Sequence, residues 1–506
     1  KLEPQNAEAW YSKATVLWKL GRFQKALEAF DRALEIRPED ARIWNDKGAL
    51  FNELGMYEEA IEAFTNVTDI EPDNAKVWFN KGTLLEKLGR NEEALQSHIR
   101  ATEIEPKLTE AWYEKGKVYE TLGQQQSALE AFTRATDLQP DNAQAWYSRG
   151  ILLQKLERAE EALESYEKAL DHEPDITGAW YGKAVILAEL GKHEKALAAF
   201  KKVTDLDPEN LQAWYNRGKI LAESGKCLEA LAALENASSN DDNKAGIWYY
   251  KGIAYEGLEK NEKALEAFAN TTELEPDNAQ AWYRLGNVHE RFGKCEEALH
   301  DYERSLKINA NLFDVWGSKG RALLKLGQYS DSLDAFERTL DLDPQHADIW
   351  YSKGEALSKL ERHEDALEAF TEASKLDPEN VQAWYYKGKM LTELGKNQDA
   401  IEAFEKVVRI MPQHSEAWYS MGMIRIITGK QQKALDCFLK ALEIDPKIGP
   451  AWYNKGVILG DQGEHEEALI ALIKASELEP ANAHVWNRLG MTLAELGQYE
   501  EALHNY

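Results

Sequence analysis

The sequence contains few cysteines, fewer basic than acidic residues and no long apolar run. Its three cysteines among 506 residues, Cys227, Cys295 and Cys437, lie far apart and form no C-x-x-C pair, which excludes a disulfide framework and a cysteine metal knuckle. Lysine and arginine number 60 against 88 acidic residues, and the resulting net charge of −28 argues against nonspecific binding to nucleic acid or an anionic membrane. No run of about 18 apolar residues occurs, so we expect no membrane-spanning segment.

Sequence motifs of catalysis are also missing. There is no G-x-S-x-G, no P-loop, no H-E-x-x-H and no paired Cys/His ligand set, and the eleven histidines are scattered. We therefore expect no enzyme activity, no cofactor and no metal. Hydrophobic residues make up 43%, which is typical of a folded chain. The acidity suits a cytoplasmic protein but does not determine the location.

Tryptophan and proline recur with one fixed period. Every step between successive register tryptophans is 34 residues, and only Trp18 is out of register. Thirteen of the 14 prolines keep a matching register, the exception being Pro450. A period of this length indicates a repeat architecture. The register residues are Trp10, Trp44, Trp78, Trp112, Trp146, Trp180, Trp214, Trp248, Trp282, Trp316, Trp350, Trp384, Trp418, Trp452 and Trp486.

Each repeat is expected to fold into two helices. Residues 7–20 carry apolar side chains at helical spacing and are followed by Gly21, a helix C-terminal signal. Residues 24–36 repeat this pattern and end before Pro38, which disfavours helical geometry at the residue preceding it. One such hairpin cannot bury its own apolar face, so we expect the 15 copies to stack into a continuous core.

These features resemble the tetratricopeptide repeat (TPR) family along the whole chain. The family pattern is W-x2-L-G-x2-Y, then A-x3-F, then P. One departure is systematic, because the leucine before the first glycine is Lys or Arg in 12 copies. The resemblance implies an all-α solenoid, a right-handed superhelix of about 15 antiparallel hairpins forming one unit over residues 1–506. Repeat two matches the pattern at Trp44, Gly48, Phe51, Gly55, Tyr57, Ala60, Phe64 and Pro72.

Two junctions and both ends of the array are irregular. Residues 237–246 lack the usual helix ending and proline, and we expect a frayed helix and a hinge near residue 240. In 309–317, Ala310 replaces the register proline and Gly317 replaces an aromatic residue. Neither end has a polar capping repeat, so we expect a segment of a longer chain; the alternative is an array that stacks end to end on other copies.

Tyrosine recurs next to the register tryptophan. With that tryptophan counted as position 4, the resemblance implies that positions 2, 5, 6, 9, 12 and 13 of each first helix line a concave face. We consider two interpretations: the position-5 rings pack against the next repeat, or they form a track for an extended peptide. Position 5 is Tyr11, Tyr113, Tyr147, Tyr181, Tyr215, Tyr249, Tyr283, Tyr351, Tyr385, Tyr419 and Tyr453.

Basic residues gather on the expected inner face of repeats nine to eleven. Gly317 removes the tyrosine ring between Arg284 and Arg321, which predicts a pocket with basic walls for an acidic peptide or carboxylate. Alternatively, these cations pair with Glu290 and Glu355 nearby. The predicted binding residues are Tyr283, Arg284, Arg291, Gly317, Arg321, Lys325, Tyr351, Lys359 and Tyr385.

Apolar residues replace polar ones on the expected inner face near the C-terminal end. Met423, Ile426 and Ile427 occupy positions 9, 12 and 13 of repeat thirteen, and Val457 and Met491 continue position 9. This pattern predicts an apolar patch for an amphipathic helix or an apolar peptide. The alternative is that another part of the protein covers it.

The function expected from these observations is a non-catalytic scaffold that binds a peptide or protein partner, with acidic character favoured, along the concave groove. The alternative is a structural protein that assembles end to end through its terminal repeats. Fold alone does not identify the partner, because solenoids of this kind serve many processes.

Overall fold

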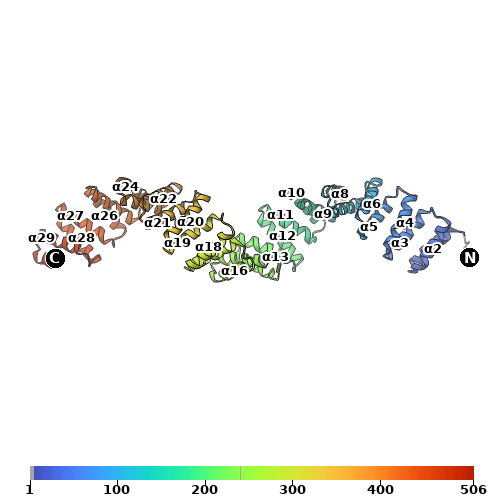
Figure 1. Cartoon of the computed structure of the whole chain (residues 1–506), viewed down its shortest axis with the longest axis horizontal. Coiled ribbons are helices and arrows are strands. Elements are labelled where there is room, and N and C mark those ends of the chain that lie inside the picture. Colours follow the sequence, from blue (N-terminus) through green and yellow to red (C-terminus); the bar gives the residue numbers. More distant parts are fainter. Residues whose placement is uncertain (1–4, 240) are drawn as a thin grey trace. The chain divides into compact units, whose positions relative to one another are not determined.

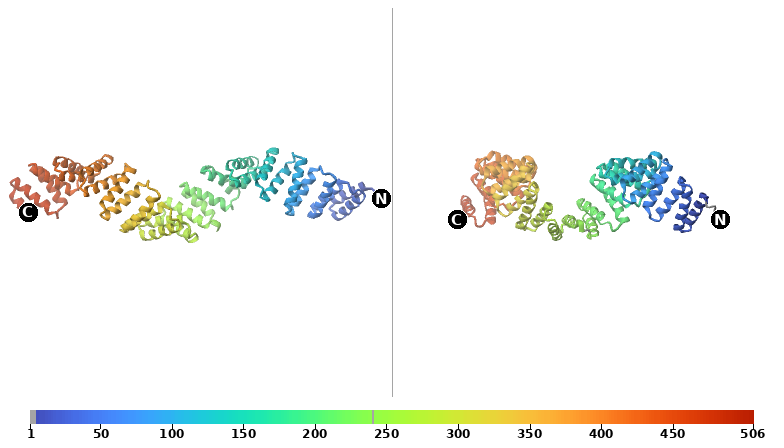
Figure 2. Two further views of the ribbon diagram at one scale, coloured as in Figure 1. Left: turned by 45° about the horizontal axis from the view of Figure 1, so that its top comes forward. Right: turned by 45° about the vertical axis from the view of Figure 1, so that its right-hand side comes forward.

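A computed structural model describes residues 5–239 and 241–506 of the chain. Over these residues it contains 30 α-helices, one short 3-10 turn and no strand. The chain divides into two compact units, the residues up to Tyr250 and those from Lys251 onward. Figures 1 and 2 show each unit as a row of antiparallel helix pairs. Every helix in the described residues is too short or too polar to cross a membrane.

The first unit begins with α1 and ends within α15. Its elements are α1 (Ala7–Lys19), α2 (Phe23–Ile36), α3 (Ala41–Glu53), α4 (Tyr57–Ile70), α5 (Ala75–Lys87), α6 (Asn91–Ile104), α7 (Thr109–Thr121), α8 (Gln125–Leu138), α9 (Ala143–Lys155), α10 (Ala159–His172), α11 (Thr177–Glu189), α12 (His193–Leu206), α13 (Leu211–Glu223), α14 (Cys227–Asn236), η1 (Asp241–Asn243) and α15 (Lys244–Gly257).

The second unit continues the same alternation. Its further helices are α16 (Asn261–Leu274), α17 (Ala279–Arg291), α18 (Cys295–Ile308), α19 (Phe313–Lys325), α20 (Tyr329–Leu342), α21 (Ala347–Lys359), α22 (His363–Leu376), α23 (Val381–Glu393), α24 (Asn397–Ile410), α25 (Ser415–Ile427), α26 (Gln431–Ile444), α27 (Gly449–Asp461), α28 (His465–Leu478), α29 (Ala483–Glu495) and α30 (Tyr499–Asn505).

The second residue after each first helix has a left-handed backbone conformation, with positive φ. Gly55 has φ +74°, and eleven equivalent glycines also have positive φ. Only glycine adopts this conformation without a steric cost from Cβ. In three repeats the position is nevertheless a glutamate, with φ values of 57° at Glu157, 56° at Glu259 and 58° at Glu361. These three glutamate side chains are exposed, so their packing does not account for the presence of glutamate in a left-handed conformation.

In most repeats the register tryptophan binds the turn that precedes its hairpin. The indole Nε1–H of Trp146 donates to the carbonyl oxygen of Pro140 at 2.9 Å, and eleven other repeats form the same bond between a tryptophan and the proline six residues before it. In repeat ten, Trp316 donates to the carbonyl of Ala310, also at 2.9 Å. The junction 309–317 therefore differs from the others in sequence and keeps the same hydrogen bond.

The basic residue that replaces the family leucine lies over the tryptophan. Lys115 Nζ lies 4.3 Å from the centre of the Trp112 ring, and the guanidinium of Arg149 lies 5.2 Å from that of Trp146. A cation over an indole face is attracted by the ring quadrupole. Burial also lowers the pKa of Lys115.

The core of each hairpin forms where a glycine faces an aromatic ring. A Cβ at Gly116 would lie 2.7 Å from Phe132, so the two helices approach too closely for a larger residue without adjustment. Phe132 is fully buried, as are most of its counterparts on other second helices. Burial of these rings supplies most of the apolar driving force within a repeat.

The chain departs from this regularity after α14. That helix has 10 residues, whereas α12 has 14, and η1 precedes α15. The helix therefore ends early in the junction 237–246. Residue 240, at the centre of the predicted hinge, lies outside the described residues.

First helices of successive repeats approach one another within each unit. Pairs such as α9 with α11 and α17 with α19 are in contact, in addition to the contacts that each makes with the intervening second helix. We call the surface formed by the first helices the first-helix face. Positions 6, 9 and 13 of the motif lie on it, and it carries the sites described next.

Candidate functional site

The tyrosines at position 5 pack inside their own repeat. The ring centre of Tyr351 lies 5.7 Å from that of Phe370, Tyr385 lies 5.8 Å from Phe404, and Tyr283 pairs with a buried tyrosine of α18. Burial raises the pKa of Tyr351 and of Tyr385. These rings are half-buried, so only part of each is presented to a ligand.

The same tyrosines also reach the next repeat. Tyr11 Oη donates to a carboxylate oxygen of Asp46 at 2.8 Å. The hydroxyl of Tyr147 lies against Gly178, which is position 2 of the following repeat and has no room for a Cβ. These contacts support the interpretation that the position-5 tyrosines pack against the next repeat. A bound peptide would contact only the exposed edges of these rings.

Two members of the predicted basic cluster share one buried carboxylate. Arg284 Nη1 lies 2.9 Å from Glu256 Oε2, and Arg291 Nη1 lies 3.2 Å from Glu256 Oε1. The Glu256 side chain is only 8% exposed. Sequence reasoning considered Glu290 and Glu355 as partners and missed Glu256, which belongs to α15 in the preceding repeat.

The remaining cations of the cluster differ in their pairing. Lys325 Nζ lies 2.7 Å from Glu290 Oε1, and Arg321 Nη1 lies 3.6 Å from a carboxylate oxygen of Asp348. Lys359 is exposed and forms no ion pair within the described residues. The cluster is thus brought to one face, and most of its charge is balanced by carboxylates.

Several ion pairs between successive first helices share one spacing along the sequence. Lys155–Glu120, Arg291–Glu256 and Lys325–Glu290 each join residues 35 apart. An acidic residue at position 12 therefore meets a basic residue at position 13 of the next repeat. Each pair ties two successive first helices together on the first-helix face.

A small pocket lies at Gly317, between α19, α20 and α21. Its volume is about 120 Å³. Arg284 does not line it, and two carboxylates do, so its walls carry mixed charge instead of the uniformly basic character expected from the sequence. The lining residues are Phe313, Asp314, Gly317, Arg321, Thr339, His346, Asp348 and Ile349.

The predicted apolar patch is partly covered. Ile427 and Met491 are 67% and 44% exposed. Met423 and Ile426 instead pack against a core cluster that includes Phe438, and Val457 is half-buried. The exposed apolar surface is therefore smaller than the sequence pattern suggested, because position 9 partly faces the neighbouring repeat.

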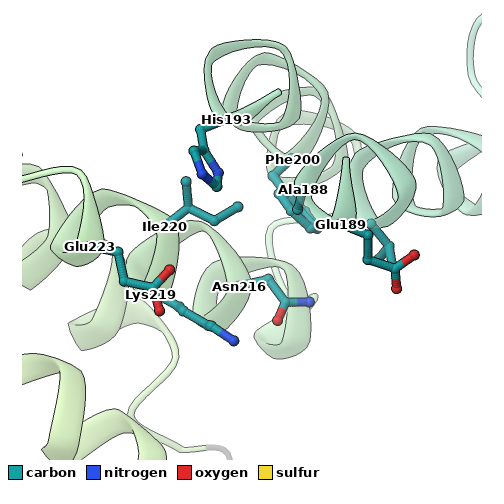
Figure 3. A pocket seen from close by; sticks show the side chains of 9 residues that line it. Ala188, Glu189, His193, Phe200, Asn216, Lys219, Ile220 and Glu223 are labelled. Atoms are coloured by element: carbon teal, nitrogen blue, oxygen red, sulfur yellow. The ribbon is translucent and has the colours of Figure 1, made fainter. Parts of the chain in front are cut away.

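A larger pocket in the first unit was not anticipated. It lies between α11, α12 and α13 and has a volume of about 340 Å³. In Figure 3 Ile220 faces Ala188 and Phe200 across it, while His193 and Asn216 lie at opposite ends. Lys219 and Glu223 line it from α13, and Glu189 lines it from α11.

A short residue of the repeat pattern, Ala188, lines this larger pocket. Ala188 occupies position 12, where Glu86, Glu120 and Gln154 stand in the three preceding repeats. The short side chain leaves the apolar floor accessible from the first-helix face. Ala222 and Ala494 are also alanine at position 12, so this substitution alone does not locate the pocket from sequence.

Evidence for metal binding or catalysis does not emerge from the geometry. Within the described part of the chain, no three His, Cys, Asp or Glu side chains converge as metal ligands. The buried His289–Asp301 pair, at 2.7 Å, lies inside a hairpin. Burial raises the pKa of Asp301, and the pair opens into neither pocket.

Comparison with solved structures finds other helical repeat proteins. YrrB, described as a TPR protein with an unusual peptide-binding site, is 26% identical; the match covers 38% of this chain and 99% of YrrB, with a TM-score of 0.36. MamA from Desulfovibrio magneticus RS-1 is 25% identical over 34% of this chain and 96% of MamA, with a TM-score of 0.32. The Cut9–Hcn1 structure matches at 15% identity over 90% of this chain and 96% of its own, with a TM-score of 0.36. No curated protein sequence matches.

Sequence profiles of one family cover almost the whole chain. Profiles described as tetratricopeptide repeat match residues 7–40, 29–62, 75–108, 113–171, 147–211, 181–245, 215–268, 249–311, 318–367, 353–414, 415–448, 437–470 and 471–504, and one described as TPR repeat matches 48–89. With the 34-residue helix pairs described above, these matches show that the chain belongs to the tetratricopeptide repeat family.

Proposed function

We propose that the chain is a non-catalytic scaffold that holds an extended peptide segment of a partner protein against its first-helix face. TPR proteins are generally non-catalytic scaffolds for protein–protein interaction, and family membership supports that broad role. The observation that carries the finer proposal is the pocket of about 340 Å³ between α11 and α13. Its size lies in the range of ligand sites, and apolar walls combined with a few polar groups are typical of them.

The pocket offers separate groups for a side chain and for a main chain. Val185, Ala188 and Ile220 form apolar walls for one large side chain of the peptide. Asn216 donates one amide hydrogen to Tyr181 Oη at 3.1 Å, and its second amide hydrogen and its carbonyl remain for a peptide backbone. An extended segment presents backbone groups and side chains alternately, which matches this arrangement.

Filling the pocket tests the proposal. A random dodecapeptide library would be selected on the full chain, and enriched peptides measured by fluorescence anisotropy. We expect Ala188→Gln, which copies Gln154 of the preceding repeat, to weaken binding at least tenfold. Ala494→Gln, the same change at position 12 of repeat fifteen, is the matched control. Failure to enrich any peptide, or equal binding by both variants, would contradict the proposal.

A second part of the face favours acidic segments. Arg321, Lys359 and Lys389 lie on successive first helices, and Lys359 has no ion pair within the described residues. Lys389 Nζ lies 5.5 Å from the ring centre of Tyr386, which places its charge beside an aromatic surface. A carboxylate-rich segment crossing α19 to α23 would gain charge-assisted hydrogen bonds.

The acidic preference has a two-sided test. A labelled (Ser-Glu)6 peptide should bind the chain more tightly than (Ser-Gln)6. Lys359→Glu should weaken that binding, while Lys307→Glu on the second helix α18 should leave it unchanged. Glu256→Gln should strengthen it, because Arg284 and Arg291 lose the carboxylate they share. Equal affinity for both peptides would contradict an acidic partner.

End-to-end assembly is the alternative function. Tyr499 and Leu503 on α30 are 69% and 77% exposed, and Val16 and Leu20 on the first repeat are 55% and 63% exposed. Such side chains would supply the apolar contacts of a head-to-tail interface. Sedimentation at increasing concentration separates the two functions: a constant monomer mass favours the scaffold, and growing mass that Leu503→Lys abolishes favours assembly.

A further inference from the structure

Repeat ten lacks the ring that neighbouring repeats place between successive first helices. In repeat eleven, Tyr351 packs against Phe370 with ring centres 5.7 Å apart, and Tyr283 fills the same place in repeat nine. Gly317 stands at the equivalent position between them. The hairpin otherwise keeps its usual core, since Phe336 is fully buried against Gly320. The missing ring is therefore a local change in an intact repeat.

The cavity occupies the space that this ring would fill. Its volume of about 120 Å³ is close to the ~150 Å³ of an engineered apolar cavity that binds benzene. The rings of Phe313 and His346 stack with their centres 5.1 Å apart and form an aromatic wall, and Ile349 also lines the cavity. Ile349 Cδ1 would be 2.9 Å from a Cβ at Gly317, so this side chain occupies only part of the vacated space.

One edge of the cavity, where the Asp348 side chain is 69% exposed, is suited to a phenol hydroxyl. In repeat five the hydroxyl of Tyr147 reaches position 2 of the next repeat, where Gly178 stands. The residue at position 2 after Gly317 is Asp348, which lines the cavity. An ionised carboxylate accepts several hydrogen bonds, so Asp348 retains acceptor sites beside its 3.6 Å contact with Arg321. Tyr11 and Asp46 show the same chemistry in repeat one, at 2.8 Å.

We propose that the Gly317 cavity binds a tyrosine side chain supplied by the partner segment, which replaces the ring missing from repeat ten. This inference rests on the proposed function, because the ring belongs to a peptide lying on the first-helix face. The aromatic wall and Ile349 receive the ring, and Asp348 accepts the hydroxyl hydrogen. The cavity thereby specifies one residue of the partner, at the point where the segment crosses α19.

A small phenol tests the cavity without requiring the partner. Binding of p-cresol to the full chain would be followed by saturation-transfer NMR, with toluene as the matched ligand lacking the hydroxyl. We expect saturable binding of p-cresol in the millimolar range and weaker binding of toluene. Ac-Ser-Tyr-Ser-NH2 should displace p-cresol, and Ac-Ser-Ala-Ser-NH2 should not. No saturable binding, or equal binding of cresol and toluene, would overturn the assignment.

The chain itself supplies a blocking variant that is compatible with the fold. Gly317→Tyr with Ile349→Ala reproduces the combination of Tyr351 and Ala383 in the next pair of repeats. We expect this variant to lose at least tenfold in p-cresol affinity while its circular dichroism is unchanged. Asn45→Tyr, which restores the ring in repeat two, should bind p-cresol as the native chain does.

These outcomes separate the inference from the proposed function. In one outcome, peptides selected for the α11–α13 pocket bind, but the folded variant Gly317→Tyr with Ile349→Ala still binds p-cresol. This outcome refutes the tyrosine site and leaves the proposed scaffold function supported. If p-cresol and the tyrosine peptide bind and the variant abolishes both, the site is supported even where the larger pocket selects no peptide.

Discussion

Glycine at the three glutamate helix ends should stabilise the protein. Glu157, Glu259 and Glu361 hold φ between 56° and 58°, where twelve other repeats have glycine. A left-handed residue with a Cβ costs about 1–2 kcal/mol, and an anionic side chain at a helix C-terminus costs about 0.3 kcal/mol more. Replacing glutamate by glycine also lowers stability by about 0.4–1 kcal/mol, because glycine increases the entropy of the unfolded chain. The net expectation is a gain of about 1 kcal/mol per site.

Hydrogen exchange at the end of α9 measures this gain directly. The amide of Arg158 donates to the carbonyl of Leu153 at 2.9 Å, and the amide of Glu157 donates to Gln154 at 3.0 Å. With Glu157→Gly, about 1 kcal/mol corresponds to roughly fivefold slower exchange of such amides when local opening controls it. Circular dichroism would confirm that the helix content is unchanged.

The reverse change in a neighbouring repeat is the control. Gly123 has φ +73°, so Gly123→Ala should speed exchange at the end of α7 by a similar factor. The three glutamates lie in separate repeats with no shared contacts, so their effects should add. Unchanged or faster exchange in Glu157→Gly would refute the reasoning, because it would mean that the exposed glutamate is stabilised in a way the contacts do not reveal.

Three further predictions concern buried polar groups and close packing. Burial and the hydrogen bond to Asp46 raise the pKa of Tyr11 to about 12, so the stability that this tyrosine contributes is complete below pH 10 and is lost as the pH rises toward 12. The difference in absorbance at 295 nm between the native chain and Tyr11→Phe should therefore titrate with a midpoint near pH 12. A midpoint near pH 10 would contradict this prediction. The double change His289→Leu with Asp301→Ala should leave stability to urea at pH 7 unchanged or raise it by up to about 4 kcal/mol, because apolar side chains replace both partners of a buried polar pair. Asp301→Ala alone should lower stability by about 1–3 kcal/mol, because the buried His289 ring loses its hydrogen-bond partner. Gly116→Ala should lower the stability to urea by about 1 kcal/mol, because the new Cβ would lie 2.7 Å from the Phe132 ring and this overpacking outweighs the better helix propensity of alanine. A gain in stability would show that the Phe132 ring moves aside without cost.

The architecture follows from local sequence signals. Glycine after the first helix, the 3.6-residue apolar spacing and the register Trp and Pro each act within a few residues, and each matches a helix boundary or a hydrogen bond in the structure. Gly116 facing Phe132 is likewise an intrarepeat contact, recognisable because small and aromatic residues recur at fixed positions. Such local rules are repeated 15 times, which makes them easy to read from sequence.

The binding surface depends on contacts between repeats, and these were harder to anticipate. The alternative interpretation paired the basic cluster with Glu290 and Glu355, but Arg284 and Arg291 share Glu256, which lies 28 and 35 residues before them on the preceding first helix. The sequence showed Lys or Arg in place of the family leucine, but the contact of Lys115 with the Trp112 ring was recognised only in the structure. The pocket beside Ala188 depends on what a short side chain leaves open, and no motif records that.

The hydrogen bond of the register tryptophan bears on how the array tolerates mutation. The indole of Trp316 binds the backbone carbonyl of Ala310 as well as other indoles bind proline carbonyls. A backbone acceptor is present whatever the side chain, so replacing the register proline by Ala310 leaves this hydrogen bond intact. Loss of the tryptophan removes the donor itself. We therefore expect substitution of a register tryptophan to disturb the stacking of its repeat more than substitution of the register proline.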